Sequence, residues 1–321
     1  GVACGAHHTI AWAAAAGGGV FSWGRGAFGA LGHGDCVDRP SPLAIEKLAS
    51  TAVSSIACGA AHSVCANRQG TVFSWGHGGS GRLGLPELEE VPGGGRLVPT
   101  LVSGVAGVYV VACGGAFTVC MTTLGALWAF GSDAQGCLGR RVRGEGGWQP
   151  ECVDLPPGTA IVSVTCGPAH CAALSHKGEL WTWGVYPGCP LSAAPADSGL
   201  LLPGSAPVCL PLPEPGVQVA CGGTFTLVLT ASGNVLQSGG TADAVTKLTP
   251  CAVRPGDGPK ALTATEKFLA KPDQAAFRQL TLPDHVGRVR LLAAGEQHAV
   301  LCTHAEMGRL HVPPIYGPAR P

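Results

Sequence analysis

The stretch Val53-Ser-Ser-Ile-Ala-Cys-Gly59 ends in a Cys-Gly pair that returns along the chain at a nearly fixed interval. The other copies are Cys4-Gly5, Cys113-Gly114, Cys166-Gly167 and Cys221-Gly222, with a weaker copy at Ala294-Gly295. Successive glycines are 54, 55, 53 and 55 residues apart, and the last interval is 73 residues. A period of this size predicts one supersecondary unit that is built repeatedly.

Two further blocks recur in each unit. Three residues after the glycine stands a His or a Phe: His8, His62, Phe117, His170, Phe225 or His298. An aromatic segment follows as Val20-Phe-Ser-Trp-Gly24, Val72-Phe-Ser-Trp-Gly76, Leu127-Trp-Ala-Phe-Gly131 and Leu180-Trp-Thr-Trp-Gly184. Its alternation has a period of two, which indicates a β-strand. Glycine-rich loops then end in Leu31-Gly32, Leu83-Gly84 and Leu138-Gly139.

Each unit therefore reads as a small antiparallel sheet. Such a sheet is marginal alone, because its apolar faces stay wet. Radial stacking buries these faces and leaves only short edges. The sequence predicts an all-β protein, a β-propeller of about six to seven four-stranded antiparallel blades.

These motifs resemble a known family. The order Cys-Gly-x-x-His-(Ser/Thr), then Gly-x-Val-Phe-Ser-Trp-Gly, then Leu-Gly is similar to the regulator of chromosome condensation repeat. The match is close in the first three units and weakens after the fourth, where Pro190-Leu191 replaces Leu-Gly. The resemblance implies a propeller, usually of seven blades.

The number of units is lower than seven, and the first begins inside a repeat. We therefore expect residues 1–321 to form a single propeller domain that is part of a longer protein. An open or six-bladed ring is the alternative. The long last interval predicts an irregular insertion at about residues 241–283.

Charge argues against two classes of partner. The formal net charge is zero, and 12% of the residues are charged. Nucleic acid and anionic membrane surfaces are bound by basic patches, so neither is an expected partner. The 36 uncharged residues between Arg96 and Asp133 are long enough for a membrane helix, but they contain Pro99 and the Gly114-Gly115 pair and align with the other units. We read them as strands, without membrane insertion.

Cysteine usage indicates an intracellular protein. The chain has 15 cysteines, an odd number, and five occupy the equivalent position before the repeated glycine. Equivalent positions in successive blades are too far apart to pair readily, and a buried free cysteine acts as a small apolar residue. Because these cysteines are expected to be unpaired, we infer that the protein resides in a reducing compartment. We expect the cytoplasm, cytoskeleton or cilium, with the mitochondrion or nucleus as alternatives.

Two patterns imitate binding sites. Gly24-Arg-Gly-Ala-Phe-Gly29 matches a dinucleotide fingerprint, but no helix pattern follows to hold a pyrophosphate. Cys58 and His62 are metal-type ligands, yet each unit offers only two, and Phe117 and Phe225 replace the His. We therefore expect packing, with the His ring bonded to the backbone of its own hairpin, and no metal, cofactor or catalytic residues.

The repeated glycines and tryptophans are interpreted as structural. The glycines permit close approach of neighbouring sheets. The tryptophans Trp23, Trp75, Trp181 and Trp183 fall on one register of the aromatic strand and are expected in the core or between blades.

The insertion is the candidate partner-binding element. It contains Thr265-Glu-Lys-Phe-Leu269 and a segment after Pro272 in which an Asp could cap a short helix. Its candidate contact residues are Lys267, Phe268, Phe277 and Arg278. A passive lid over a degenerate blade is the alternative.

Function is predicted from these points together. We expect a non-enzymatic scaffold for protein–protein interaction, acting with other proteins in a large complex or a multidomain chain. The resemblance also implies an alternative, a guanine-nucleotide exchange factor for a small GTPase, but no position here matches residues for that activity.

Overall fold

The computed structural model describes residues 1–13, 19–86, 94–141, 147–184, 206–239, 278–280, 289–295 and 299–303. These residues form five four-stranded antiparallel sheets and one two-stranded sheet. In each of them the strands are hydrogen-bonded in chain order, so every neighbouring pair is antiparallel and locally connected.

The strand bounds repeat from sheet to sheet. The first sheet holds β1 (Val2–Cys4), β2 (His8–Trp12), β3 (Val20–Gly24) and β4 (Arg39–Ala44). The second holds β5 (Val53–Cys58), β6 (His62–Asn67), β7 (Val72–His77) and β8 (Gly95–Leu101). The third holds β9 (Val108–Cys113), β10 (Phe117–Thr122), β11 (Leu127–Gly131) and β12 (Glu151–Cys152). The fourth holds β13 (Ile161–Cys166), β14 (His170–Ser175), β15 (Leu180–Gly184) and β16 (Val208–Leu210). The fifth holds β17 (Gly216–Cys221), β18 (Phe225–Thr230), β19 (Val235–Gly239) and β20 (Arg278–Gln279), and the sixth holds β21 (Val289–Ala294) and β22 (Ala299–Thr303).

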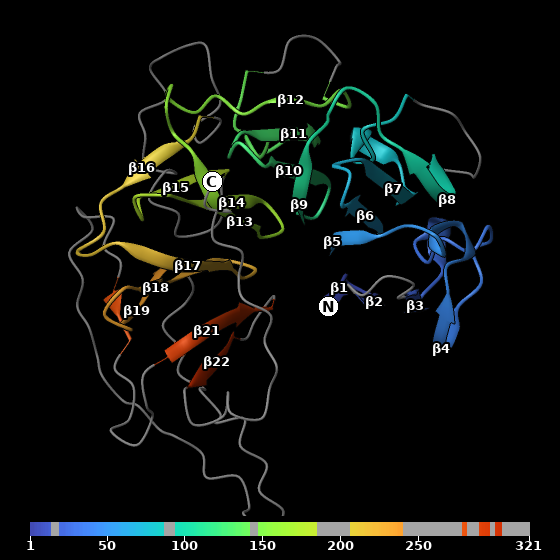
Figure 1. The fold of residues 1–321 in the computed structure, drawn as a ribbon, viewed down its shortest axis with the longest axis horizontal. Coiled ribbons are helices and arrows are strands. Elements are labelled where there is room, and N and C mark those ends of the chain that lie inside the picture. The colour runs from blue at the N-terminus through green and yellow to red at the C-terminus, as the bar shows by residue number, and fades with distance from the viewer. Residues whose placement is uncertain are drawn as a thin grey trace, which may run out of the picture.

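The sheets follow one another in chain order around a common centre, and the first and sixth sheets are the two ends of this arc (Figure 1). The first strand of each sheet contacts the first strand of the next, from β1 and β5 through to β17 and β21. These strands are therefore the innermost, and the fourth strands lie at the rim. This arrangement confirms the predicted all-β propeller.

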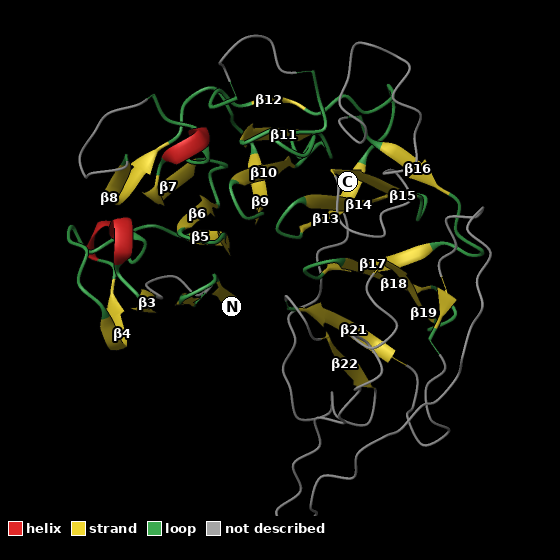
Figure 2. Cartoon of the chain, turned by 180° about the vertical axis from the view of Figure 1, so that it is seen from behind, coloured by secondary structure: helices red, strands yellow, loops and turns green. Residues whose placement is uncertain are grey.

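Helical structure in the described ranges is limited to three short 3₁₀ turns, η1 (Ala27–Gly29), η2 (Glu46–Leu48) and η3 (Gly79–Gly81) (Figure 2). The turn η1 lies in the Gly24–Gly29 loop and packs on β7 and β8 of the next sheet. Phe28 inside it has φ of 59°, so no α-helix begins there. The described part of the chain thus contains no helix long and apolar enough to span a bilayer.

The hydrophobic core lies between the sheets. One cluster joins Val64 and Val72 of the second sheet to Val111 and Phe130 of the third. Another joins Ala172 and Leu180 of the fourth sheet to side chains of the fifth. Burial between sheets, rather than within one, explains why a single unit cannot be stable alone.

One strand contradicts the sequence analysis. Arg278 and Gln279 belong to β20, which pairs with β19 through Leu236 and Gln237, and Leu280 packs on the apolar core. A helix that includes Arg278 and Gln279, as considered after Pro272, is therefore excluded. Residues 240–277, the part of the predicted insertion that precedes β20 in the chain, lie outside the described residues.

Candidate functional site

The predicted partner-binding residues are placed only in part. Lys267, Phe268 and Phe277 lie outside the described residues. The backbone of Arg278 forms β20 opposite Gln237. The proposal that these residues contact a partner stays a prediction.

The repeated histidines lie at the interfaces between successive sheets, which we call seams. In the seam between the second and third sheets, His62 Nε2 is 3.1 Å from Thr118 Oγ1. Thr118 donates its own hydroxyl hydrogen to the carbonyl of Arg82, at 2.9 Å. The hydroxyl oxygen is therefore the acceptor for His62, whose proton is on Nε2.

A contact between the His ring and a hydroxyl of the next sheet recurs in two other seams. His8 Nε2 is 2.9 Å from Ser63 Oγ, and Ser63 donates to the carbonyl of Ala30 at 3.0 Å. His170 Nε2 is 3.1 Å from Thr226 Oγ1. The expectation that each His bonds the backbone of its own hairpin is wrong, because the partner is a hydroxyl in the next sheet. The sequence carried a signal for this, namely the Ser or Thr that follows the His or Phe in four of the six units.

Burial keeps these histidines neutral. Desolvation lowers the pKa of His8 to about 4, with a smaller contribution from His7. Desolvation also lowers the pKa of His62 to about 3 and that of His170 to about 4, and Arg82 adds to the effect at His62. A buried imidazole with its proton committed to a neighbouring hydroxyl is a structural group, unsuited to acid–base chemistry at neutral pH.

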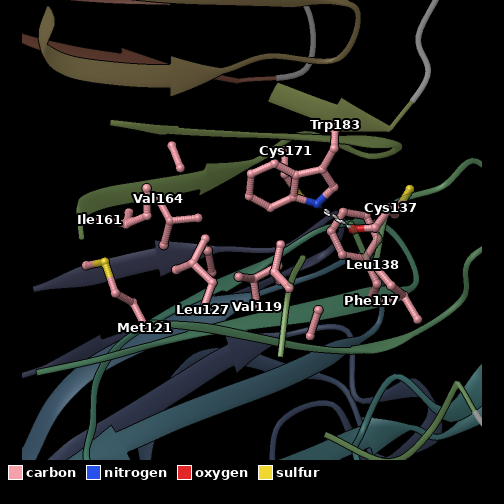
Figure 3. Close-up of a cluster of buried hydrophobic side chains, with 14 residues drawn as sticks. Phe117, Val119, Met121, Leu127, Cys137, Leu138, Ile161, Val164, Cys171 and Trp183 are labelled. Atoms are coloured by element: carbon pink, nitrogen blue, oxygen red, sulfur yellow. Dashed lines mark hydrogen bonds between the residues drawn. The ribbon is translucent and has the colours of Figure 1, made fainter. Parts of the chain in front are cut away.

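Where the unit carries Phe in place of His, the facing residue is apolar. Phe117 lies in one buried cluster with Cys171 of the fourth sheet, and Figure 3 shows both side chains there. Phe225 lies in a cluster on which Ala299 of the sixth sheet packs. Cys171 and Ala299 occupy the position that Ser63, Thr118 and Thr226 hold in their own sheets.

The aromatic strand closes the same seams. The indole Nε1 of Trp75 donates to the carbonyl of Ala30 at 2.9 Å. Trp183 donates in the same way to Cys137 at 2.9 Å, the dashed line in Figure 3. Trp75 and Trp183 are fully buried between blades, whereas Trp181 is half-buried. Trp23 is only half-buried.

Glycines let these groups approach. A Cβ at Gly32 or Gly139 would lie 2.9 Å from the indole Nε1 of Trp75 or Trp183. The glycine of the Leu-Gly motif is therefore in contact with the tryptophan of the following sheet. A Cβ at Gly59 would lie 2.6 Å from the carbonyl oxygen of Gly114, its counterpart in the next sheet. The repeated glycine is thus required by contact between sheets, as the sequence indicated.

The cysteines of the seams are structural as well. Burial raises the pKa of the Cys65 and Cys137 thiols to about 12, and it raises the pKa of Cys58, Cys113 and Cys221 further. Such thiols are poor nucleophiles and poor metal ligands. In the described ranges, no three His, Cys, Asp or Glu side chains converge as a metal site would require.

Sequence comparison identifies the repeat. A family model described as the regulator of chromosome condensation (RCC1) repeat matches residues 17–66, 69–121 and 125–174, and a second model of that description matches residues 53–82. The match 17–66 runs from β3 to β6, so one sequence repeat spans one seam.

Individual curated proteins are also similar to this chain in sequence. The chain is 37% identical over 185 residues to the ultraviolet-B receptor UVR8 of Arabidopsis thaliana, covering 57% of this chain and 40% of that protein. It is 37% identical over 169 residues to the human E3 ubiquitin-protein ligase HERC2, covering 51% of this chain and 3% of HERC2. The chain therefore spans less than half the length of these curated relatives.

Solved structures show the same fold at lower identity. Prp20p of Saccharomyces cerevisiae superposes with a TM-score of 0.69 at 18% identity, over 95% of this chain and 69% of that chain. Human WBSCR16 superposes with a TM-score of 0.65 at 23% identity, over 94% of this chain and 86% of that chain. Residues 17–174 therefore carry RCC1 repeats, and the described sheets have the fold of the solved RCC1-type β-propellers.

Proposed function

We propose that this chain is a non-enzymatic propeller for protein–protein interaction, acting as a scaffold within a larger assembly or a multidomain protein. One observation carries the proposal. The repeated histidines, the natural acid–base candidates of the sequence, are used to hold neighbouring sheets together. The residues that recur therefore build the fold, and the connecting loops are left to vary with the partner.

The relatives support a role as one module among several. The part of HERC2 that is similar to this chain is 3% of that ligase, so such a propeller can be a small part of a very long protein. The solved structure of Prp20p is described together with its binding of Gsp1p and histones, which are proteins. We extend protein binding, without a named partner, to this chain.

The insertion is the proposed contact element, through Lys267, Phe268, Phe277 and Arg278. The test is quantitative pull-down with mass spectrometry, comparing the chain with the double variant Phe268→Asp/Phe277→Asp. The matched control is Leu124→Asp, because Leu124 is 87% exposed in the turn between β10 and β11. We expect the double variant to keep its melting temperature and lose its specific partners, while the control keeps both.

Two outcomes would change this assignment. A double variant that melts earlier but retains its partners would make the insertion structural. Stimulated release of labelled GDP from any member of a panel of small GTPases would replace the scaffold role with nucleotide exchange, the alternative that the family resemblance implies.

We propose an intracellular location, supported by the free thiols at Cys36, Cys152 and Cys209 on the exposed surface. The cytoplasm, cytoskeleton and cilium remain the proposed sites, with the nucleus and the mitochondrion as alternatives. RUG3 of Arabidopsis thaliana, 37% identical over 172 residues, is a mitochondrial protein. Imaging of a fluorescent fusion of the chain in cells decides between them.

A further inference from the structure

The fourth sheet pairs two cysteines at a position where the other described sheets carry one or none. In the inner hairpin of each sheet, the residue before the repeated glycine lies opposite the residue after the repeated His or Phe. In the fourth sheet these two are Cys166 of β13 and Cys171 of β14. The pairs in the other described sheets are Cys4–Thr9, Cys58–Ser63, Cys113–Thr118, Cys221–Thr226 and Ala294–Ala299.

The backbone of this hairpin suits a disulfide. The amide of Gly167 donates to the carbonyl of His170 at 2.8 Å, so these two residues form a hydrogen-bonded pair. Because the two kinds of pair alternate along an antiparallel ladder, Cys166 and Cys171 form a non-hydrogen-bonded pair, with Cα atoms about 4.5 Å apart. That spacing lies within the range of about 4.4–6.8 Å that disulfides bridge. The two sulfurs are already 3.5 Å apart, so bond formation requires rotation of the side chains and no rearrangement of the strands.

Other sheets hold the same contact in a form that cannot be oxidised to a bond. Cys113 Sγ is 4.0 Å from Thr118 Oγ1, and Cys221 Sγ is 4.0 Å from Thr226 Oγ1. The hairpin therefore brings these side chains together in several sheets. The fourth sheet differs in its chemistry, because two thiols have a reversible oxidised state and a thiol with a hydroxyl does not.

The two thiols differ in access. Cys171 is fully buried, and burial, followed by the contact with Cys166, raises the pKa of its thiol. Cys166 is half-buried at the end of β13 and packs against the apolar cluster between the third and fourth sheets. A small oxidant from solution therefore reaches Cys166 first, while Cys171 is held beside it as the second thiol.

We propose that Cys166 and Cys171 form a reversible redox site that a hydroperoxide closes to a disulfide. The Cys166 thiolate attacks the peroxide, so that an S–O bond forms, the O–O bond breaks, and hydroxide leaves and takes up the proton of the thiol as water. The Cys171 sulfur then attacks the Cys166 sulfur. The S–S bond forms, the S–O bond breaks, and hydroxide leaves with the Cys171 proton as a second water. Two thiols and one hydrogen peroxide thus give one disulfide and two waters.

Reduction runs by thiol–disulfide exchange with a dithiol, which is itself oxidised to a disulfide as the two protein thiols are restored. A transient bond of this kind is compatible with a reducing compartment. The inference goes beyond the proposed scaffold role and does not depend on it.

Oxidation of this pair acts on the seam between the third and fourth sheets. The Cys171 thiol donates to the carbonyl of Cys137 at 3.7 Å, and Trp183 donates to the same carbonyl at 2.9 Å. Figure 3 shows Cys171, Trp183 and Cys137 together in this seam. A disulfide sulfur carries no hydrogen, so the carbonyl loses the thiol donor and keeps the indole. The redox state of the fourth sheet therefore alters the hydrogen bonding that joins it to the third.

The first test uses the unaltered chain. The reduced native protein is treated with hydrogen peroxide, its remaining thiols are alkylated in denaturant, and tryptic peptides are analysed without reduction by tandem mass spectrometry. Residues 144–177 form one peptide that contains Cys166, Cys171 and exposed Cys152. We expect this peptide to lose two hydrogens through a bond between Cys166 and Cys171, with Cys152 alkylated, and dithiothreitol to restore both thiols. A bond from Cys166 to another cysteine, or sulfinic acid at Cys166 beside a reduced Cys171, overturns the proposal.

Two variants test the order of the steps. Cys171→Ala and Cys166→Ala each place alanine where the sixth sheet has Ala299 or Ala294, so the hairpin accommodates both, and thermal melts check this. In Cys171→Ala, dimedone should trap sulfenic acid at Cys166 at least tenfold more than in the unaltered chain, with equal trapping at exposed Cys36 as the control. In Cys166→Ala, Cys171 should stay reduced. Equal trapping at Cys166 with and without Cys171, or oxidation of Cys171 in Cys166→Ala, overturns the assigned roles.

A third measurement tests the link to the seam. The indole N–H signals of Trp183 and Trp75 are followed by NMR before and after oxidation and are assigned with Trp→Phe variants. The Trp183 signal should shift, because its acceptor loses the second donor. The Trp75 signal should stay in place, because its acceptor is the carbonyl of Ala30 in another seam. A Trp183 signal that does not move on formation of the disulfide overturns the link between this redox site and the seam.

Discussion

The indole of Trp75 donates its hydrogen bond to Ala30, a residue 45 positions earlier that belongs to the preceding sheet. The same carbonyl accepts the hydroxyl of Ser63, which in turn accepts from His8. One loop oxygen of the first sheet is therefore bound by two strands of the second. Such bonds fix the angle and height at which successive sheets stack, in addition to the apolar area they bury.

Trp75→Phe should destabilise the fold by about 1–2 kcal/mol, because the buried carbonyl of Ala30 loses one donor and the smaller ring leaves space. Phe130 holds this position in the third sheet, so the substitution is compatible with the backbone. Chemical denaturation measures the loss. The matched control is Trp23→Phe on the first sheet, where the indole is only half-buried, and we expect a loss of less than about 0.5 kcal/mol. Equal losses at the two positions would contradict the role assigned to the seam.

Gly59→Val and Gly114→Val should each cost several kcal/mol, on the order of the severe tail of single substitutions. At Gly59 the added Cβ would lie 2.6 Å from the carbonyl oxygen of Gly114, a backbone atom that cannot turn aside. Gly78→Ala is the control, since its Cβ would meet nothing closer than 3.4 Å. Thermal melts of the three variants check this prediction. A melting temperature unchanged by either valine would show that the sheets can separate at the repeat glycine.

The fold was predictable because the motifs that mark its strands recur in the sequence at a nearly constant interval. The Cys-Gly pairs and the aromatic strand Val72–Gly76 mark the first three strands of the sheets, and both are visible without coordinates. The rim strand was not predictable. In β4 it reads Arg-Pro-Ser-Pro-Leu-Ala, with two prolines and no alternation, because an edge strand needs neither a complete hydrogen-bond ladder nor two buried faces.

The seams were harder to predict than the strands. The exchange of His for Phe correctly indicated packing, but sequence reasoning assigned each His to its own hairpin. The partner of His62 is 56 residues away, and its identity depends on which neighbouring sheet lies on which side. Only a three-dimensional arrangement brings Thr118 to that ring. The same holds for β20, whose position beside β19 could not be read across the long insertion.

Thiol labelling should divide the cysteines by their place in the seams. Cys65, Cys120 and Cys137 are fully buried, and burial raises their pKa values, to about 12 for Cys65 and Cys137. Their thiolate populations at neutral pH are minute, so they should react with iodoacetamide at least a hundredfold more slowly than exposed Cys36. Mass spectrometry of the partly labelled native protein measures these rates, and unfolding in urea should abolish the difference. Fast labelling of Cys65 in the native protein would place that thiol outside a closed seam.

Mild acid should loosen the propeller through its histidines. His8, His62 and His170 have pKa values of about 4, 3 and 4 in the fold, whereas an unfolded His titrates near 6.5. Their contribution is fully present above about pH 6.5 and is lost as the pH falls toward 4, because only the unfolded chain binds protons in that window. Each histidine should add at most about 1.4 kcal/mol of lost stability per pH unit. Urea unfolding between pH 7 and 4.5 measures this slope. In the His62→Phe/Thr118→Ala variant the slope should be smaller by the contribution of one histidine, at most about 1.4 kcal/mol per pH unit. An unchanged slope in that variant would mean that His62 is not held neutral in the folded seam.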